Sequence, residues 1–407
     1  MTQPENPPAA RPDPFFSIPV DRTWNACIGP QGDEENYVDG FIDAALALAN
    51  LILEKEMFVA RDTLVLPILY NARHGVELSL KFAMTRLLAA GILKVSHAVN
   101  HDIASHWQHL QQASIGDEAI RRHLSELQPY IMSLASIDDD GQQLRFATDV
   151  EGNPSLEDKP LANIQVIRNS LVVLQKVLRD LKNHLLRLCA ENTLGSHTDE
   201  CSRMDLMSIA RMLPPRTEWS SASFTTAKQS VQERYKLSGK KFCTALDAIQ
   251  ANREMSAQLG VETILTHLTD ASARMLIDQW STVHPVRPRA DEKLGVDYFG
   301  KRDWEDTRLY FERKTAARNV ILQTLSPEEI ADADTIYYLG RDGNLPEQYD
   351  GLLAQEKNNH AEADGLRLSV DNLLSKTNLL KSLVRGLRRL GKTTLASTLE
   401  SMRPDML

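Results

Sequence analysis

The chain has 407 residues, with 46 Lys and Arg against 55 Asp and Glu, a formal net charge of −9, and 42% hydrophobic but only 6% aromatic residues. At about 150 residues per domain, this length predicts two or three domains, each long enough to bury a core. The apolar and charged fractions exclude a disordered or fibrous protein. The acidic balance argues against a general nucleic-acid coat but permits a local basic face.

The cysteines and the N-terminal segment bear on the compartment. The four cysteines form no CxxC pair, so the sequence contains neither a zinc ribbon nor a thioredoxin-type site, and their scarcity favours a reducing compartment. Residues 1–20 lack the basic and apolar regions of a signal peptide, and their prolines predict a disordered arm. The longest apolar stretch, Phe41–Leu53, contains Asp43 and Asn50 and is too short and too polar to cross a bilayer. We therefore expect a cytoplasmic protein that does not contact a membrane.

Helical periodicity dominates the first half of the chain. The first four predicted helices cover about 39–60, 63–90, 102–112 and 119–134. Asp102 is the expected N-cap of the third helix, and the fourth is expected to bend or end near Pro129. Residues 142–150 alternate in polarity between Asp-Gly and Gly-Asn-Pro turn signals, which predicts a short strand or β-hairpin. A long leucine-rich helix follows over Ala162–Ala190.

The periodicity stops over residues 191–222, which contain Gly195, Pro214 and Pro215. Helices resume near Phe224, and Ser326-Pro327-Glu328-Glu329 has the pattern of a capped helix start. Four other helices predicted in this half cover about 224–237, 239–258, 260–280 and 304–324. After the capped start at Ser326, we expect a helix that begins near residue 346, a longer helix over 366–390 and a short helix that ends near residue 402.

These elements predict a mainly α protein built from two helical-bundle domains. The predicted order is a disordered arm over 1–20, a helical domain with a small β-hairpin insertion over 21–190, a linker over 191–222 and a second helical domain over 223–407.

The C-terminal segment Gly386–Thr393 satisfies the phosphate-binding pattern G-x-x-x-x-G-K-[ST]. A functional loop of this kind follows a β-strand, whereas the preceding residues here carry a leucine stripe with helical spacing. Only 14 residues follow Thr393, which leaves no room for the second metal-binding strand of such a site. We interpret the match as coincidental, with a helix break at Gly391.

Residues 381–392 contain five cations and no acid: Lys381, Arg385, Arg388, Arg389 and Lys392. Lys381, Arg385 and Arg389 recur every four residues and therefore lie on one helix face. This strip could contact phosphates or a partner protein, or it could be a solvated face that offsets acids elsewhere.

Four of the eleven histidines, His97, His101, His106 and His109, lie within 13 residues. The spacing of His97 and His101 would place two imidazoles on one helix face, as zinc requires. With Asp102 as N-cap, however, His101 precedes the helix, and neither a carboxylate nor a cysteine supplies an obvious third ligand. We therefore interpret these histidines as a polar helix face and expect neither a metal nor another cofactor.

Residues 70–81 read YNARHGVELSLK, with the form R-H-x-x-E-L-x-x-K, and are followed by His101-Asp102-Ile103, Trp107 and Leu144-Arg145-Phe146 ahead of the long helix. As a set, these features resemble HEPN-like helical proteins (higher eukaryotes and prokaryotes nucleotide-binding) over about residues 39–190. The second half of the chain resembles no family that we can name.

The resemblance implies a metal-independent endoribonuclease with an R-x4–6-H motif, acting as a homodimer in a toxin or anti-phage defence system. Arg179 and His184 satisfy R-x4-H. In that role His184 would transfer protons and Arg179 would stabilise charge on the scissile phosphate. Residues five apart on an unbroken helix lie about 140° apart, so convergence of the two would require a helix distortion or a second subunit.

Arg73, Glu77 and Lys81 form a ladder at i, i+4 spacing, whose ordinary role is structural. Under the resemblance, Arg73 and His74 could instead contribute to the site, with Glu77 and Lys81 lining or bracing it. Two alternatives remain open: a non-catalytic interaction protein that docks a partner from the same operon, and a ligand-sensing helical bundle.

Overall fold

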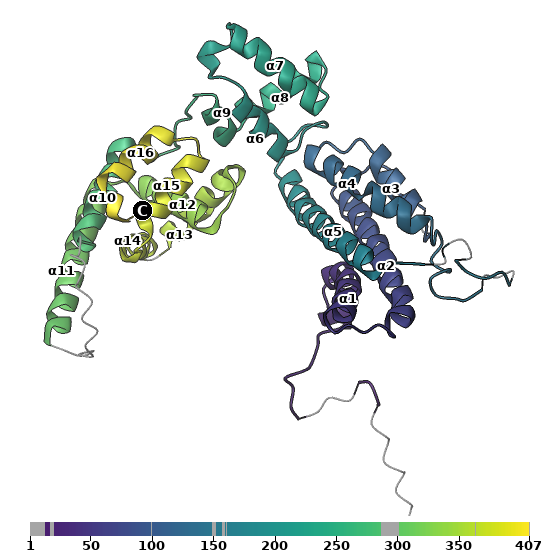
Figure 1. The fold of residues 1–407 in the computed structure, drawn as a ribbon. Coiled ribbons are helices and arrows are strands. Elements are labelled where there is room, and N and C mark those ends of the chain that lie inside the picture. The colour runs from purple at the N-terminus through teal and green to yellow at the C-terminus, as the bar shows by residue number, and fades with distance from the viewer. Residues whose placement is uncertain are drawn as a thin grey trace, which may run out of the picture. The chain divides into compact units, whose positions relative to one another are not determined.

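The computed structural model describes residues 13–16, 20–98, 100–148, 152–156, 159, 161–285, 301–362 and 364–406. The arm predicted over 1–20 lies largely outside these residues. Within them the regular elements are helices and no strand is present, so the predicted mainly α class is confirmed (Figure 1).

The chain divides into two compact units. Unit 1 comprises Met1–Thr85, His97–Leu110 and His123–Lys182, and unit 2 comprises Arg86–Ser96, Gln111–Arg122 and Asn183–Leu407. Two short segments of the first half and the end of the long helix thus belong to unit 2. A division of this kind depends on contacts between distant segments, so a break in periodicity along the chain does not reveal it.

The helices of the first half are α1 (Glu34–Glu54), α2 (Arg61–Ala89), α3 (Ile103–Gln112), α4 (Glu118–Ala135) and α5 (Ile164–Asn192). The side chain of Asp102 accepts the N–H of Ser105, which confirms it as the N-cap of α3. α4 continues through Pro129 as a single helix. In unit 1, α1 packs closely on α2, because Gly75 leaves room for the backbone of Ile42.

One described helix, α1, is long and apolar enough to cross a membrane by length and composition alone. Its apolar stripe of Val38, Ile42, Ala45, Ala49 and Ile52 is buried in the structure. Core helices of soluble proteins pass the same test, so this single helix is compatible with a soluble protein.

The β-hairpin expected over 142–150 is not seen among the described residues, and 149–150 lie outside them. The described part forms a turn, with Arg145 and Phe146 N–H groups donating to the carbonyl of Gln142, and then a single antiparallel bridge between Thr148 and Pro154. The Asp138 carboxylate accepts the N–H groups of Gln143 and Leu144. These backbone groups are therefore satisfied by a side chain instead of a strand partner.

Unit 2 continues with α6 (Arg203–Met212), α7 (Ala222–Tyr235), α8 (Gly239–Ala251), α9 (Arg253–Gln258), α10 (Asp270–Val283), α11 (Lys301–Thr324), α12 (Pro327–Asp342), α13 (Tyr349–Ala361), α14 (Gly365–Ser375), α15 (Leu379–Arg389) and α16 (Thr393–Met402) (Figure 1). The capping box of Ser326 and Glu329 is confirmed at the start of α12.

The interval expected to be a linker contains α6. Leu206, Ile209 and Ala210 of α6 are buried in one apolar cluster with Phe242 and Ile249 of α8. Their spacing is helical, but the run is only ten residues long and is surrounded by serine, glycine and proline, which hid the signal.

The helix expected over 366–390 is divided into α14 and α15. At the break, the carbonyl of Lys376 accepts the indole N–H of Trp280, and the carbonyl of Leu374 lies 2.8 Å from His284 Nε2. Side chains at the end of α10 thus engage carbonyls that α14 leaves unpaired. The division lets α15 pack against α12, where Gly340 and Gly386 bring the two backbones together.

Candidate functional site

α2 places three charged side chains in a row on one face. The Arg73 guanidinium donates to Glu77 Oε2 at 2.9 Å, and the Lys81 ammonium donates to Glu77 Oε1 at 2.6 Å. Arg73 and Glu77 are 1% and 2% exposed. The predicted ladder therefore exists, but two of its three members are buried, unlike an ordinary surface ladder.

Arg73 connects α2 to two loops through main-chain atoms. Its Nε donates to the carbonyl of Asp138 at 2.7 Å, and its Nη2 donates to the carbonyls of His101 at 2.6 Å and Asp139 at 3.0 Å. All three guanidinium nitrogens are thus engaged, which makes Arg73 a positioning residue for the loop of His101. Gly141, at φ +83°, packs against the guanidinium, where a Cβ would lie 3.1 Å from Nη1.

His101 completes this group, which we call the Glu77 cluster: Arg73, His74, Glu77, Lys81 and His101. The Nδ1 of His101 lies 2.9 Å from Glu77 Oε1, while its side chain is 68% exposed. Burial alone would raise the pKa of Glu77, but hydrogen bonds from Lys81, His101 and Arg73 outweigh it and lower that pKa to about 2. Glu77 is therefore a carboxylate at neutral pH, and it orients an imidazole that faces solvent.

His74 lies at the edge of the cluster, with Nδ1 4.0 Å from Glu77 Oε2. Its ring meets Phe41 edge-on at 4.4 Å and stacks on Tyr70 at 5.8 Å. Burial lowers the pKa of His74 despite the nearby carboxylate. The structure therefore brings together three predicted site residues, Arg73, His74 and Glu77.

Arg179 and His184 each have a different acidic partner. Arg179 Nη2 donates to both carboxylate oxygens of Asp43 at 2.9 Å, on exposed parts of α5 and α1. His184 Nε2 lies 3.0 Å from Asp117 Oδ1, and both side chains are buried. α5 runs as one helix through both residues, so the angular separation between them is retained. A joint catalytic role for this pair stays a prediction.

The carboxyl group of Asp205 is also buried and accepts the N–H of Glu118 at 2.9 Å. Burial, and then the charge of Asp117, raise the pKa of Asp205 to about 7. Between about pH 4 and pH 7 the folded state thus holds a proton that the unfolded state has lost. The contribution of Asp205 to stability therefore falls as the pH rises through that interval, by up to about 1.4 kcal/mol per pH unit.

We expect Asp205→Asn to flatten this decline and to raise the melting temperature of unit 2 above pH 7, because the amide keeps an acceptor for the Glu118 N–H without a charge. Thermal unfolding at pH 5 and pH 8 measures the effect. Asp199→Asn, which removes an exposed acid, is the control and should shift neither value. Parallel pH profiles for Asp205→Asn and the wild type would contradict the prediction.

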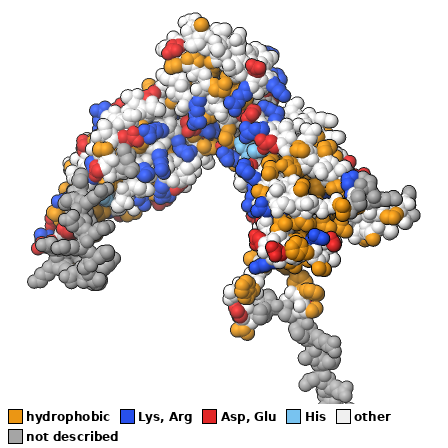
Figure 2. Space-filling view, in the orientation of Figure 1, with side chains coloured by type: hydrophobic (Ala, Val, Ile, Leu, Met, Phe, Trp, Pro, Cys, Tyr) orange, Lys and Arg blue, Asp and Glu red, His pale blue; other side chains and the backbone are white. Residues whose placement is uncertain are grey.

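The cations of the C-terminal strip are only partly accessible. Arg388 pairs with Glu400, Arg389 donates to the carbonyls of Gly343 and Asn344, and Lys392 lies 4.0 Å from Glu262. Lys381 and Arg385 are exposed on α15. Lys and Arg side chains are also frequent on the face of the C-terminal helices seen in Figure 2.

The geometry of Gly386–Thr393 differs from that of a phosphate-binding loop. It follows helix α15, and the start of α16 already holds a carboxylate: Glu262 Oε1 accepts the N–H of Thr394 and the hydroxyl of Thr393, both at 2.6 Å. Gly391 has φ +74°, as expected for a helix break. Gly386 serves the packing of α15 on α12.

The clustered histidines are brought together only in part. The rings of His97 and His109 stack at 4.7 Å, and His97 meets His106 edge-on at 5.1 Å. His101 binds Glu77 instead.

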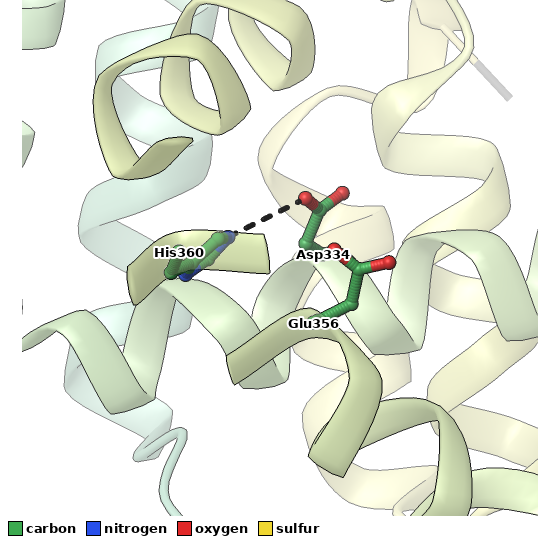
Figure 3. A group of neighbouring side chains, drawn as sticks. All are labelled: Asp334, Glu356 and His360. Atoms are coloured by element: carbon green, nitrogen blue, oxygen red, sulfur yellow. Dashed lines mark ion pairs between the residues drawn. The ribbon is translucent and has the colours of Figure 1, made fainter. Parts of the chain in front are cut away.

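Sequence analysis missed two features. The first is the contact of His101 with Glu77, which the spacing of the histidines along the sequence does not indicate. The second is a group formed by Asp334, Glu356 and His360 (Figure 3). A Glu-x3-His spacing within a predicted helix was the available signal for the second group.

Comparison with known proteins found no matching family model, no matching curated protein and no matching solved structure. The HEPN-like resemblance therefore stays a prediction.

Proposed function

We propose that this protein binds RNA and cleaves it without a metal ion at the Glu77 cluster. The observation that carries the proposal is the exposed imidazole of His101, hydrogen-bonded at 2.9 Å to the buried carboxylate of Glu77. A buried carboxylate that orients an imidazole is a recurrent arrangement in proton-transfer catalysis.

The chemistry requires only the side chains of the cluster and the RNA. With its Nδ1 proton donated to Glu77, His101 keeps Nε2 available to accept the proton of a ribose 2′-hydroxyl. The 2′-oxygen attacks the adjacent phosphorus and the bond to the 5′-oxygen breaks. Return of the proton to that oxygen leaves a 2′,3′-cyclic phosphate and a 5′-hydroxyl.

Cations around the cluster support phosphate binding. Lys81 is 31% exposed and shares Glu77 Oε1 with His101. Arg145 is exposed and packs over the ring of Tyr70, which also stacks on His74. Such groups stabilise the charge that develops on a phosphate during displacement.

We expect the wild-type protein to cleave total RNA in the presence of EDTA and to leave cyclic phosphate ends. His101→Ala should slow cleavage by about 100-fold or more, as for loss of a general acid–base. His109→Gln, which changes a histidine outside the cluster, is the control and should retain activity. Gel analysis with end-group chemistry measures both.

His184→Ala in the same assay separates the two predicted sites. If His184→Ala loses cleavage activity while His101→Ala retains it, the catalytic site is at Arg179 and His184 and not at the Glu77 cluster. If the wild-type protein neither cleaves nor binds RNA, the proposed function is refuted. That result would favour the alternative of a non-catalytic interaction or ligand-sensing protein.

A role in a cytoplasmic defence or toxin system, as a homodimer, belongs to the same proposal. Exposed apolar side chains on α2 and α5, including Leu66, Val166 and Val173, support self-association. A measurement of the molar mass in solution tests whether the protein is a homodimer.

A second candidate is docking of a protein partner from the same operon on the C-terminal strip. Its support is that Lys381 and Arg385 are exposed on one face of α15. Lys381→Glu with Arg385→Glu should abolish binding of the purified neighbouring gene product while RNA cleavage remains intact.

A further inference from the structure

Three potential metal ligands converge in unit 2, far along the chain from the Glu77 cluster. Glu356 and His360 lie one turn apart on α13, and Asp334 faces them from α12 (Figure 3). One ligand atom from each residue lies within 4.8 Å of the others, and His360 Nε2 is 3.9 Å from Asp334 Oδ2. Small side-chain rotations would bring these atoms to the separations found around a single ion, where each bond is about 2.0–2.2 Å long.

His360 is the independent sign of a ligand. Its side chain is 5% exposed, yet neither ring nitrogen has a hydrogen-bond partner among the described residues. A buried imidazole ordinarily has at least one nitrogen paired. In this group the ring faces two carboxyl groups, so a cation between them would provide the missing interaction.

The charges of the group point the same way. Asp334 is buried and Glu356 is half-buried, so two carboxyl groups lie close to the imidazole with little access to water. Arg341 is near, but its guanidinium is paired with Asp342 at 2.5 Å and packs over Tyr338. A divalent ion would balance both carboxylates.

We propose that Asp334, Glu356 and His360 bind a divalent transition-metal ion, with Zn²⁺ preferred. One imidazole and two carboxylates suit Zn²⁺ and, more weakly, Mn²⁺, whereas Mg²⁺ prefers oxygen ligands alone.

The surroundings fit a site with three protein ligands. The hydroxyl of Ser369 donates to Asp334 Oδ2 at 2.6 Å and fixes the orientation of that carboxylate, as outer-shell groups of metal sites do. The group lines an open cavity of ≈ 430 Å³. Water in the cavity can therefore complete the coordination, as in zinc sites that keep an open position.

The test is calorimetric titration of the full-length, chelator-treated protein with Zn²⁺, Mn²⁺ and Mg²⁺ separately. We expect one Zn²⁺ to bind per chain, Mn²⁺ to bind with lower affinity, and Mg²⁺ to bind with the lowest affinity of the three. His360→Gln and Glu356→Gln should each weaken Zn²⁺ binding by at least about 10-fold, and Ser369→Ala by about 10-fold. Because Glu356 is half-buried and the His360 ring has no hydrogen-bond partner in the part of the chain that the structure describes, these variants should keep the fold, which circular dichroism checks.

His97→Gln is the matched control, because His97 belongs to the other histidine group and its loss should leave the affinity unchanged. Bound Co²⁺ should lack the sulfur-to-metal absorption of thiolate sites. No saturable Zn²⁺ binding, equal binding by the wild type and His360→Gln, or loss of binding in His97→Gln would each overturn the proposal.

Discussion

Replacing Arg73 by methionine is expected to lower the free energy of unfolding of unit 1 by about 3–5 kcal/mol, the usual cost of removing one member of a buried ion pair. The side chain is 1% exposed, and its loss would leave the Glu77 carboxylate buried with one cation fewer. It would also leave the carbonyls of Asp138, Asp139 and His101 without a donor. Hydrogen exchange of α2 and α3 in increasing urea measures the loss within unit 1.

Lys81→Met is the matched control, since Lys81 is on the same helix and pairs with the same carboxylate but is 31% exposed. Its cost should be about 0–1 kcal/mol. Adding Glu77→Leu to Arg73→Met should restore part of the stability, because both buried charges are then removed. Equal costs for the Arg73 and Lys81 variants would show that Arg73 does not organise the two loops.

Gly386→Ala is expected to destabilise unit 2 by about 3 kcal/mol or more, at the upper end of the cost of overpacking. A Cβ at this position would overlap the carbonyl oxygen of Ile336 on α12, and one on Gly340 would overlap the carbonyl of Ser382 on α15. Backbone atoms cannot rotate away as a side chain can, so the two helices would have to separate. Thermal unfolding measures the effect.

Gly351→Ala provides the opposite control. Gly351 lies in α13, and a Cβ there meets no atom within 4 Å. Alanine should therefore raise stability by up to about 1 kcal/mol through its better helix propensity. A similar small gain for Gly386→Ala would mean that α12 and α15 are not in close contact.

Helices α1, α2, α4 and α5 were predictable because each carries a long apolar stripe. α3 has only ten residues, but the cap at Asp102 is a local signal of its start, as Ser326 is for α12. α6 was not predicted, because its ten-residue run lies among serine, glycine and proline. The break between α14 and α15 was not predicted, because it depends on partners distant in sequence, such as Trp280, which donates to the carbonyl of Lys376. Local spacing cannot show where such a partner will be.

The Glu77 cluster was predictable in part for the same reason. Arg73, His74 and Glu77 share α2, so their spacing indicated that they lie together. His101 lies 28 positions after Arg73 in the sequence, in a loop that Arg73 holds next to Glu77. The spacing of residues on one helix does not indicate such a contact. Asp334 likewise joins Glu356 and His360 from another helix.

Arg73 holds residues 101 and 139 through their carbonyl oxygens, a group that every amino acid provides. Among the loop residues that the structure describes, only Asp138 also pairs with Arg73 through its side chain, at 3.7 Å. The exposed side chain at position 139 can therefore diversify while its loop keeps its place. Directed evolution of substrate preference could begin there, since a library at this position would alter the surface offered to a ligand and leave the scaffold and the His101 imidazole unchanged.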